Sequence, residues 1–392
     1  MNFKIKTVPI LVLFILLITV PLPSFAADGL IMVVGDVLPL KNQIVWRNLV
    51  RLSERREGEH LVIAAAHDRP KLYGGFTLRA YQRYGKVADL IPLAEEFQEF
   101  STDQRYLKKD EATAERIQSA SSVFFVGGKP ERLSKVLFDR RGRPTALSSA
   151  IQEAYDGGSL IVGGIPGRFV VSTQADPFHA LEEGELEDDE FANGLGLLEH
   201  EWYIDQHYFG RGRFATSLVA MHQFGMQYGI GVGLDTAAVV HGNSVEVLGN
   251  RGVVIIDLSE ASFEDSRRGL KIENVRLSYL ESGDRTEIGS KEVTPYSSKK
   301  NGFEITPNWE ASPDAKVISS KEVFRPGELV RLMYEAIDSK DGQAIGYALH
   351  HEDDEGFEFR FFTRKDSRGW LSVEDDQERV TLENVYLDVN PI

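Results

Sequence analysis

The stretch Ser159-Leu-Ile-Val-Gly-Gly-Ile-Pro-Gly-Arg-Phe169 decides how this sequence is interpreted. Its apolar residues predict a buried strand, and the glycines followed by a proline predict a tight turn into a helix. The spacing Gly163-x-Ile165-x-Gly167 is that of a nucleophile elbow, in which glycines permit a cramped turn that raises the middle side chain above the sheet edge. That middle residue is Ser or Cys in an elbow, whereas Ile165 can neither attack a carbonyl nor give up a proton. The stretch therefore predicts a hydrolase-like frame without its nucleophile.

Buried apolar runs alternate with helical patterns on the N-terminal side of this stretch. The runs LIMVVG at 30–35, LVIAAA at 61–66 and SVFFV at 122–126 are continuous, as in parallel strands that are buried on both faces. Apolar residues between them recur at helical spacing. This alternation predicts an α/β fold with a mostly parallel sheet and helices on both faces. Ligands of such sheets bind beyond the carboxyl ends of the strands, where Gly127-Gly128 and the elbow are expected to lie.

The first 26 residues have the pattern of a secretory signal peptide. Lys4 and Lys6 precede an apolar run at 8–20, and Ser24-Phe25-Ala26 offers small residues for cleavage after Ala26. An uncleaved membrane anchor is the alternative, and it would need about 20 apolar residues to cross a bilayer. We therefore expect a secreted or extracytoplasmic protein with no membrane association after cleavage. The chain has no cysteine, so the exported protein is held together without disulfides.

The chain is strongly acidic, with 44 Lys and Arg against 60 Asp and Glu and a net charge of −16. Loss of the two lysines of the predicted signal peptide would lower the charge to −18. Nucleic acids and anionic membranes are therefore poor candidate partners, and cationic ligands, including arginine-rich ones, fit better. Plain solubility is the alternative explanation of the acidity. We predict no cofactor and no metal site, and a homodimer is possible.

The texture of the sequence changes after about residue 258. Alternating apolar residues at 275–279, 357–361 and 385–389 predict strands separated by charged loops, and Pro326 opens an amphipathic helix pattern. We place a boundary between 258 and 288. Residues 27–288 are then one α/β domain, and residues 289–392 are a smaller β-rich C-terminal extension with one helix.

The block from Trp202 to Arg213 is dense with reactive side chains. His207 is the best candidate for a general acid or base, although a lone histidine is often structural. Arg211 and Arg213 flank one glycine and could together clamp a carboxylate, with ordinary ion pairing to the acidic run at 182–190 as the alternative. That run by itself is typical of a solvated loop.

Five motifs occur in a fixed order: FFVGG at 124–128, the elbow, DQHYFGRGR at 205–213, GIGVGLDTA at 229–237 and GNSVEVLG at 242–249. Together they resemble the cyanophycinase group of serine peptidases, relatives of aspartyl dipeptidase and peptidase E. The resemblance covers about residues 30–288, and the tail at 356–391 is similar to that of exported members. It implies a flavodoxin-like sheet related to class I glutamine amidotransferases. It also implies cleavage of β-aspartyl-arginine units from cyanophycin, a polyaspartate that carries arginine side chains.

The resemblance also implies roles for individual residues. His207 corresponds to the base, Gly128 to a backbone oxyanion donor, and Glu183 to the acid that orients the histidine. The implied substrate pocket is shaped by Asp205, Gln206, Arg211 and Arg213.

Three departures fall on this implied pocket. Gly164-Ile165-Pro166 replaces the Thr-Ser-Ala of the family elbow, Lys129-Pro130 replaces Asp-Gln after the glycine pair, and Thr216 stands where a third arginine is expected. Loss of the serine from a serine protease lowers turnover roughly a millionfold, about 8 kcal/mol of barrier. Rescue by Ser159, inside the predicted strand, or by Ser172, about two predicted helical turns beyond the elbow, is not expected.

We therefore expect a catalytically impaired protein of cyanophycinase type that binds at most an aspartate-arginine or related peptide. One alternative is a hydrolase with non-serine chemistry, for example metal-assisted through His207, Asp205 and the acidic run. Another is a binding or interaction protein of the cell envelope that uses its C-terminal portion.

Overall fold

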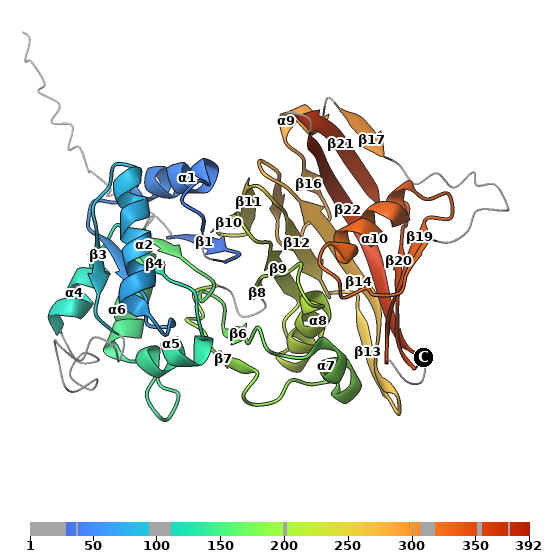
Figure 1. Ribbon diagram of the computed structural model, residues 1–392, viewed down its shortest axis with the longest axis horizontal. Helices are drawn as coiled ribbons and strands as arrows, with labels where there is room; N and C mark the ends of the chain where they lie inside the picture. Colours follow the sequence, from blue (N-terminus) through green and yellow to red (C-terminus); the bar gives the residue numbers. More distant parts are fainter. Residues whose placement is uncertain are drawn as a thin grey trace, which may run out of the picture.

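The computed structural model describes residues 29–36, 38–93, 111–198, 202–300, 302–305, 318–350, 355–374 and 377–392. The predicted signal peptide lies outside these residues. Within them the chain is a mixed α/β protein with two large sheets of nine and eleven strands (Figure 1). In the described part of the chain, no helix is long and apolar enough to cross a membrane.

The nine-stranded sheet contains the parallel strands that the sequence predicts. Its order is β16-β15-β11-β10-β1-β5-β4-β2-β3. The parallel half consists of β1 (Leu30–Val34), β5 (Leu160–Val162), β4 (Ser122–Phe125), β2 (His60–Ile63) and β3 (Ala88–Ile91). All residues of β1, β2, β4 and β5 are buried, as their continuous apolar runs require. Because parallel strands end at the same edge, the residues that follow β1, β4 and β5 meet there.

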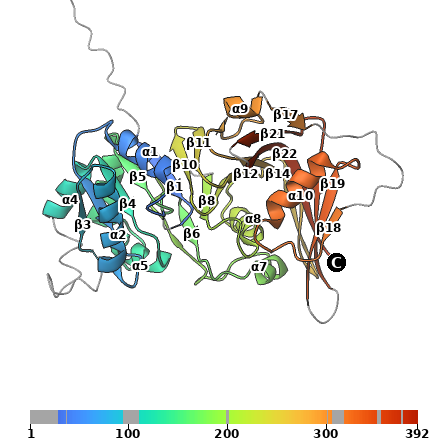
Figure 2. The ribbon, with the colours of Figure 1, turned by 45° about the horizontal axis from the view of Figure 1, so that its top comes forward.

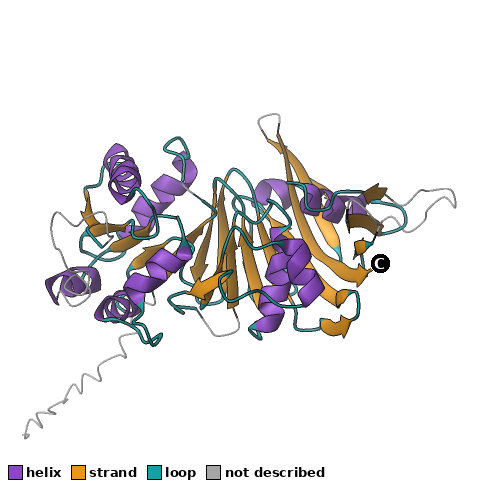
Figure 3. Cartoon of the chain, turned by 60° about the horizontal axis from the view of Figure 1, so that its bottom comes forward, coloured by secondary structure: helices purple, strands orange, loops and turns teal. Residues whose placement is uncertain are grey.

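Helices cover both faces of this parallel half (Figure 3). Alternate residues of β1 enter two separate hydrophobic clusters. Leu30, Met32 and Val34 pack with residues of α1 and α2, whereas Ile31 and Val33 pack with residues of α4, α5 and α6. These helices are α1 (Gln43–Ser53), α2 (Pro70–Arg83), α4 (Glu111–Gln118), α5 (Pro130–Leu137) and α6 (Ala146–Asp156). The predicted coverage of both faces is confirmed for this half.

The sheet as a whole is mixed, not mostly parallel. Its remaining strands pair antiparallel, and they are β10 (Thr236–His241), β11 (Ser244–Gly249), β15 (Arg285–Glu287) and β16 (Val293–Thr294). Only Gly242 and Asn243 connect β10 to β11, and Gly242 has a φ of 53°. A connection this short permits a hairpin, whereas a parallel pair needs a crossover of about a dozen residues.

The eleven-stranded sheet joins the middle of the chain to its C-terminal part. Its main order is β18-β19-β20-β22-β14-β12-β9-β8, with β13, β17 and β21 paired beside this path. From the middle of the chain come β8 (Trp202–Gln206), β9 (Tyr228–Val232), β12 (Val253–Asp257), β13 (Ser262–Ser266) and β14 (Gly269–Leu280). The later strands are β17 (Phe303–Ile305), β18 (Ile318–Ser320), β19 (Gln343–Leu349), β20 (Gly356–Phe362), β21 (Arg368–Glu374) and β22 (Gln377–Pro391).

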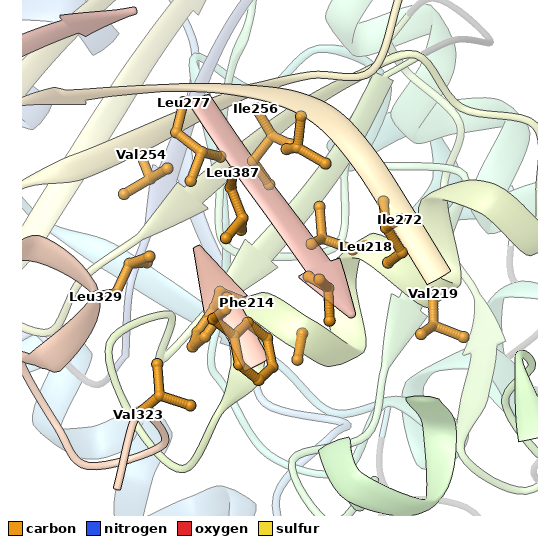
Figure 4. Close-up of a cluster of buried hydrophobic side chains, with 14 of the residues drawn as sticks. Phe214, Leu218, Val219, Val254, Ile256, Ile272, Leu277, Val323, Leu329 and Leu387 are labelled. Carbon is orange, nitrogen blue, oxygen red and sulfur yellow. The ribbon is translucent and has the colours of Figure 1, made fainter. Parts of the chain in front are cut away.

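Strands from both sides of the predicted boundary share one core. β14 pairs with β12 on one side and with β22 on the other. Phe214 and Leu218 belong to α8 (Arg213–Gln223) and share a hydrophobic cluster with Leu387 of β22 (Figure 4). The division into residues 27–288 and 289–392 stays a prediction, and it would cut through this sheet and this core.

Two further helices belong to the C-terminal part: α9 (Ser297–Lys300) and α10 (Glu328–Asp338). The amphipathic helix predicted after Pro326 is α10, which begins after Gly327 in a left-handed conformation. It lies against β19 (Figure 2) and also contacts β20. It buries one stripe of residues: Leu329, Leu332, Met333, Ala336 and Ile337.

The helix predicted after the elbow is wrong. Gly163, with a φ of 139°, turns the chain after β5, but the chain then continues into β6 (Phe169–Val171), which pairs with β7 (Phe191–Asn193). The carbonyls of residues 165–167 accept hydrogen bonds from the amides of residues 195–197 at 2.9–3.0 Å, so they are not used in a helical turn. Aromatic and β-branched side chains at 169–171 also favour a strand. The frame of a nucleophile elbow, strand followed by helix, is therefore absent here.

Candidate functional site

Two cavities meet at the edge where the parallel strands end. The narrow cavity has a volume of about 210 Å³ and is lined by residues of α1, α2, β4 and the segments after β1 and β8. The broad groove has a volume of about 1730 Å³ and extends to β14 and the start of α10. Both are lined by Asp36, Gly127, Gly128 and His207. This junction is the candidate functional site, at the sheet edge that the sequence predicts.

His207 is fixed by its backbone directly after β8. Its φ of 57° is uncommon for a residue other than glycine. Its N–H donates to the carbonyl of Gly35 at 3.0 Å, and its own carbonyl accepts from the N–H of Gly210 at 3.0 Å. The imidazole is 37% exposed, and its Nε2 atom lies 3.5 Å from Oδ1 of Asp36. The histidine is therefore placed at the cavity junction with a carboxylate at ion-pair distance.

Asp36 was missed by the sequence reasoning, which assigned the orienting acid to Glu183. The structure places Glu183 at the exposed end of α7 (Pro177–Glu183). Of the described acidic residues, Asp36 is the one within 4 Å of the His207 imidazole. A signal was available, because Gly35-Asp36 directly follows the first parallel strand, where side chains of the functional edge are expected. The role of Glu183 stays a prediction that this geometry does not favour.

Asp205 and Arg213 form a buried ion pair. Both are 4% exposed, and Nε of Arg213 donates to Oδ2 of Asp205 at 3.1 Å, with a second bond from Nη2 to Oδ1. Ser217 donates to the same carboxylate at 2.8 Å, and Arg213 also donates to the carbonyls of Val171 and Ser172. Burial lowers the pKa of Arg213, but the Asp205 carboxylate together with Tyr203 and Tyr208 outweighs this effect, and the net shift of the pKa is upward. This pair ties β8 to α8 and to the end of β6, and so supports the backbone that carries His207.

Gln206 and Arg211 lie on different cavities. Gln206 lines the narrow cavity, and its side-chain amide donates to the carbonyl of Val34. A Cβ at Gly164 would collide with that carboxamide, so the close approach of these two residues requires the glycine. Arg211 is exposed on the broad groove, whereas Arg213 is buried. The two arginines therefore do not form the predicted joint clamp.

Gly128 has the position expected of the glycine pair, beside His207 at the junction. Its φ is 157°, and a Cβ there would collide with the backbone of Ala66, in the segment after β2. The next amide, that of Lys129, donates to the carbonyl of Ala66 at 2.8 Å. Pro130 is the first residue of α5, where a missing N–H costs no helical hydrogen bond. The Lys129-Pro130 departure is thus compatible with a regular helix start.

Ile165 does not reach either cavity. It is 4% exposed and packs in the hydrophobic cluster under the helices α4, α5 and α6. Thr216 is fully buried inside α8, and its hydroxyl has no partner among the described residues. Ser159 is also fully buried, with its hydroxyl donating to the carbonyl of Ala120 at 2.6 Å. None of these three side chains is available to a ligand.

Two hydroxyl residues of the segment after β6 line the cavities. Ser172 directly follows β6 and borders the broad groove, so its predicted place two helical turns beyond the elbow is wrong. Its Oγ accepts from the N–H of Gln174 at 3.2 Å. Thr173 is exposed and borders both cavities, and the sequence reasoning overlooked it.

Two histidine–carboxylate pairs lie at the site: His207 with Asp36, and His67 with Asp68. Within the described ranges, no three residues of the kinds His, Asp and Glu lie close enough together to hold a metal ion. The predicted acidic run ends α7 and forms local contacts, including one of 3.2 Å between Glu187 and His179. The alternative that joins His207, Asp205 and this run is not supported by their placement.

Comparison with known proteins finds relatives that are similar to this chain in sequence. No protein-family model matches the chain. The cyanophycinases of Trichormus variabilis and of a Nostoc species are each 25% identical to it over 286 residues, which is 69% of this chain and 89% of theirs. The cyanophycinase of Geminocystis herdmanii is 26% identical over 239 residues, 57% of this chain and 80% of that enzyme.

Among solved structures, the crystal structure of a peptidase from an acI-B1 actinobacterium superposes with a TM-score of 0.49 at 17% identity. It covers 67% of this chain and 98% of that one. Over about two thirds of its length, the chain is similar in sequence to cyanophycinases.

Proposed function

We propose that this protein is an exported, cyanophycinase-like protein that binds an aspartate-derived peptide where the two cavities meet and that lacks serine hydrolysis. The observation that carries the proposal is the separation of the two parts of a peptidase site. His207 and Asp36 lie open at the junction, while Ile165 is buried in the core. The similarity to cyanophycinases supports a peptidase-like function and a cyanophycin-like ligand. Export, and a flavodoxin-like arrangement of residues 27–288, are parts of the proposal that rest on the sequence.

The chemistry of the junction fits binding better than turnover. A histidine beside a carboxylate can accept a proton or donate one to a bound amide or carboxylate. An acyl intermediate, however, forms only when the oxygen of a hydroxyl group or the sulfur of a thiol group attacks the carbonyl carbon. The position after Gly164 offers a buried hydrocarbon instead.

The test combines a turnover assay with a binding assay on the mature protein. We expect no release of dipeptide from insoluble cyanophycin, and we expect calorimetry to detect binding of β-aspartyl dipeptides at millimolar concentration. His207→Ala will weaken that binding. The matched control His241→Ala removes an exposed histidine at the β10–β11 turn and will leave binding unchanged.

Three outcomes would contradict the proposal in different ways. If no β-aspartyl dipeptide binds, the peptide site is wrong. Turnover that disappears in Thr173→Val would identify the overlooked hydroxyl as a nucleophile. Turnover that a chelator removes would favour the metal-assisted alternative.

A further inference from the structure

We infer that the narrow cavity receives an apolar or aromatic side chain of the bound peptide, so this protein prefers aspartyl peptides with an apolar second residue to those with arginine. The inference rests on the proposed peptide site and specifies its ligand. The expected ligand differs from an arginine-bearing peptide. The reasons are the shape, the lining and the charges of the cavity.

The wall of the narrow cavity is built from rings and aliphatic side chains. Trp46 and Phe124 are buried, and their rings stack at a centroid distance of 5.8 Å with planes 7° apart. Leu40 and Phe76 are 36% and 41% exposed, which is unusual for such large apolar side chains. Other apolar lining residues are Leu38 and Tyr73. The cavity therefore offers a rigid apolar floor and a partly exposed apolar wall.

The volume suits one ring. An engineered apolar cavity of about 150 Å³ in another protein stays dry and binds benzene. The present cavity, at about 210 Å³, has room for a phenyl ring with its methylene group, or for a leucine side chain. Transfer of such a group from water into an apolar cavity is favourable.

The narrow cavity has no unpaired carboxylate among the described residues that line it, and so none that could bind a guanidinium. Two carboxylates line it: Asp205 is neutralised by Arg213, and Asp36 faces His207. A guanidinium buried without an unpaired carboxylate would lose its hydration without full compensation. Every charged lining residue of the narrow cavity is thus already paired within the chain.

Two of the lining rings, those of Phe76 and Tyr73, already have an arginine beside them. The guanidinium carbon of Arg79 lies 4.6 Å from the ring centroid of Phe76, and that of Arg69 lies 5.6 Å from the centroid of Tyr73. A ligand arginine would meet these like charges where it needs a free aromatic face. An uncharged ring meets no such repulsion.

The broad groove complements the carboxylates of the same peptide. Although the chain carries a net charge of −16, its groove is lined by exposed basic residues from several separate segments. Five of them form no ion pair with any residue in the described ranges: Lys41, Lys129, Arg132, Arg211 and Arg251. Acidic residues also line the groove: Asp36, Asp68, Glu131, Asp235 and Glu281. All of these except Glu131 have charged or hydrogen-bonding partners among the described residues. The unpaired charge of the groove is therefore mostly basic, and it attracts anions locally. A peptide with its apolar side chain in the cavity would place its carboxylates in this groove.

The experiment compares four ligands by calorimetry on the whole mature protein: β-aspartyl-phenylalanine, β-aspartyl-leucine, β-aspartyl-arginine and 3-phenylpropionate. We expect the phenylalanine and leucine dipeptides to bind on the order of tenfold more tightly than the arginine dipeptide. We expect 3-phenylpropionate to compete with them, because its ring takes the cavity and its carboxylate reaches the groove.

A matched pair of variants tests the location. Leu40→Asp places a carboxylate at the cavity wall. It will therefore weaken binding of the phenylalanine dipeptide and strengthen binding of the arginine dipeptide. Leu72→Asp is the control, because Leu72 is 43% exposed on α2 but does not line the cavity, and it will change neither affinity.

The outcomes separate this inference from the proposed function. Equal or tighter binding of the arginine dipeptide, or an unchanged ratio in Leu40→Asp, overturns the inference and leaves the peptide site standing. Binding of 3-phenylpropionate that depends on Leu40, without binding of any dipeptide, keeps the apolar cavity and removes the peptide site. Absence of binding by all four ligands overturns both.

Discussion

At the scale of single residues, the Asp205–Arg213 ion pair and His207 have different roles within the segment 205–213. The pair is buried and bonded to β8, α8 and the end of β6, whereas His207 is exposed at the cavity junction. Removal of one partner from a buried pair leaves an uncompensated charge, which is costlier than losing the pair as a whole. Asp205 and Arg213 therefore position the histidine and do not need to touch a ligand.

Arg213→Ala will lower the free energy of unfolding by about 3–5 kcal/mol, because it leaves the Asp205 carboxylate buried and unpaired. Urea denaturation measures this loss. Arg211→Ala is the matched control, and since that side chain is exposed, its effect will stay within about 0.5 kcal/mol. Similar losses in both variants would show that Arg213 does not hold this part of the fold.

Ile165→Ser will not restore hydrolysis of cyanophycin, although it recreates the serine of a family elbow. The side chain at this position faces the core, so the new hydroxyl would be buried away from His207. The substitution will instead destabilise the protein by about 2–5 kcal/mol through the cavity and the unsatisfied hydroxyl. Ile165→Val, the conservative control, will cost only about 0.5–1.5 kcal/mol. Release of dipeptide by Ile165→Ser would show that the residue reaches the site.

At the scale of secondary-structure elements, the parallel strands place the candidate site, and the segment after β5 differs from the predicted strand–turn–helix frame. The carboxyl ends of β1 and β4 bring Asp36 and the glycine pair to the junction. After β5, backbone bonds to residues 195–197 and the pairing of β6 with β7 replace the helix of an elbow. The same sheet edge therefore carries the histidine and the glycines, while Ile165 is buried in the core.

The junction between β2 and β4 makes stability depend on pH. His60, the first residue of β2, is buried, and its Nδ1 atom lies 2.9 Å and 3.0 Å from the hydroxyls of Ser121 and Ser122. Burial, with a smaller effect from Lys86, lowers the pKa of His60 below its ordinary value of 6.5. In the folded state the imidazole therefore stays neutral at a pH where the unfolded chain already binds a proton.

This linkage predicts that stability falls as the pH is lowered from about 6.5 toward the folded-state pKa of His60. Urea denaturation at a series of pH values measures the slope. His60→Gln will reduce the slope, whereas His241→Gln, at an exposed position, will retain it. An unchanged slope in His60→Gln would show that other groups cause the dependence.

At the scale of the whole molecule, the C-terminal strands complete the second sheet. The aromatic side chains of β20 and the aliphatic side chains of β22 share a cluster with α8, the helix that starts at Arg213. Figure 4 shows Leu387 of β22 in this cluster with Phe214 and Leu218 of α8. Full burial of one such side chain contributes about 1.5–3 kcal/mol. The part of the chain that carries His207 is thus stabilised by residues from beyond the predicted boundary.

A chain that comprises residues 27–288 will therefore fail to unfold cooperatively. It would expose β14 along the edge that pairs with β22, together with the cluster around Phe214 and Leu218. Thermal denaturation followed by circular dichroism checks this, with residues 27–392 as the control that unfolds in a single sharp transition. A cooperative transition of the shorter chain would establish residues 27–288 as an independent domain.

The sequence by itself determined the features that depend on local patterns. Continuous apolar runs specified β1, β2 and β4, helical spacing specified α10, and the glycine pair was correctly placed at the edge where the strands end. These predictions succeeded because periodicity, helix starts and the position of a strand end are encoded within a few neighbouring residues.

The tertiary structure alone decided which of these residues face one another. Asp36, not Glu183, lies beside His207, Arg213 is taken up by Asp205, and Ile165 is buried instead of raised above the sheet. It also joined the C-terminal strands to the sheet of β8. The physical reason is that pairing, burial and side-chain direction arise from contacts between segments far apart in the chain. A local pattern such as Gly163-x-Ile165-x-Gly167 is compatible with more than one set of such contacts.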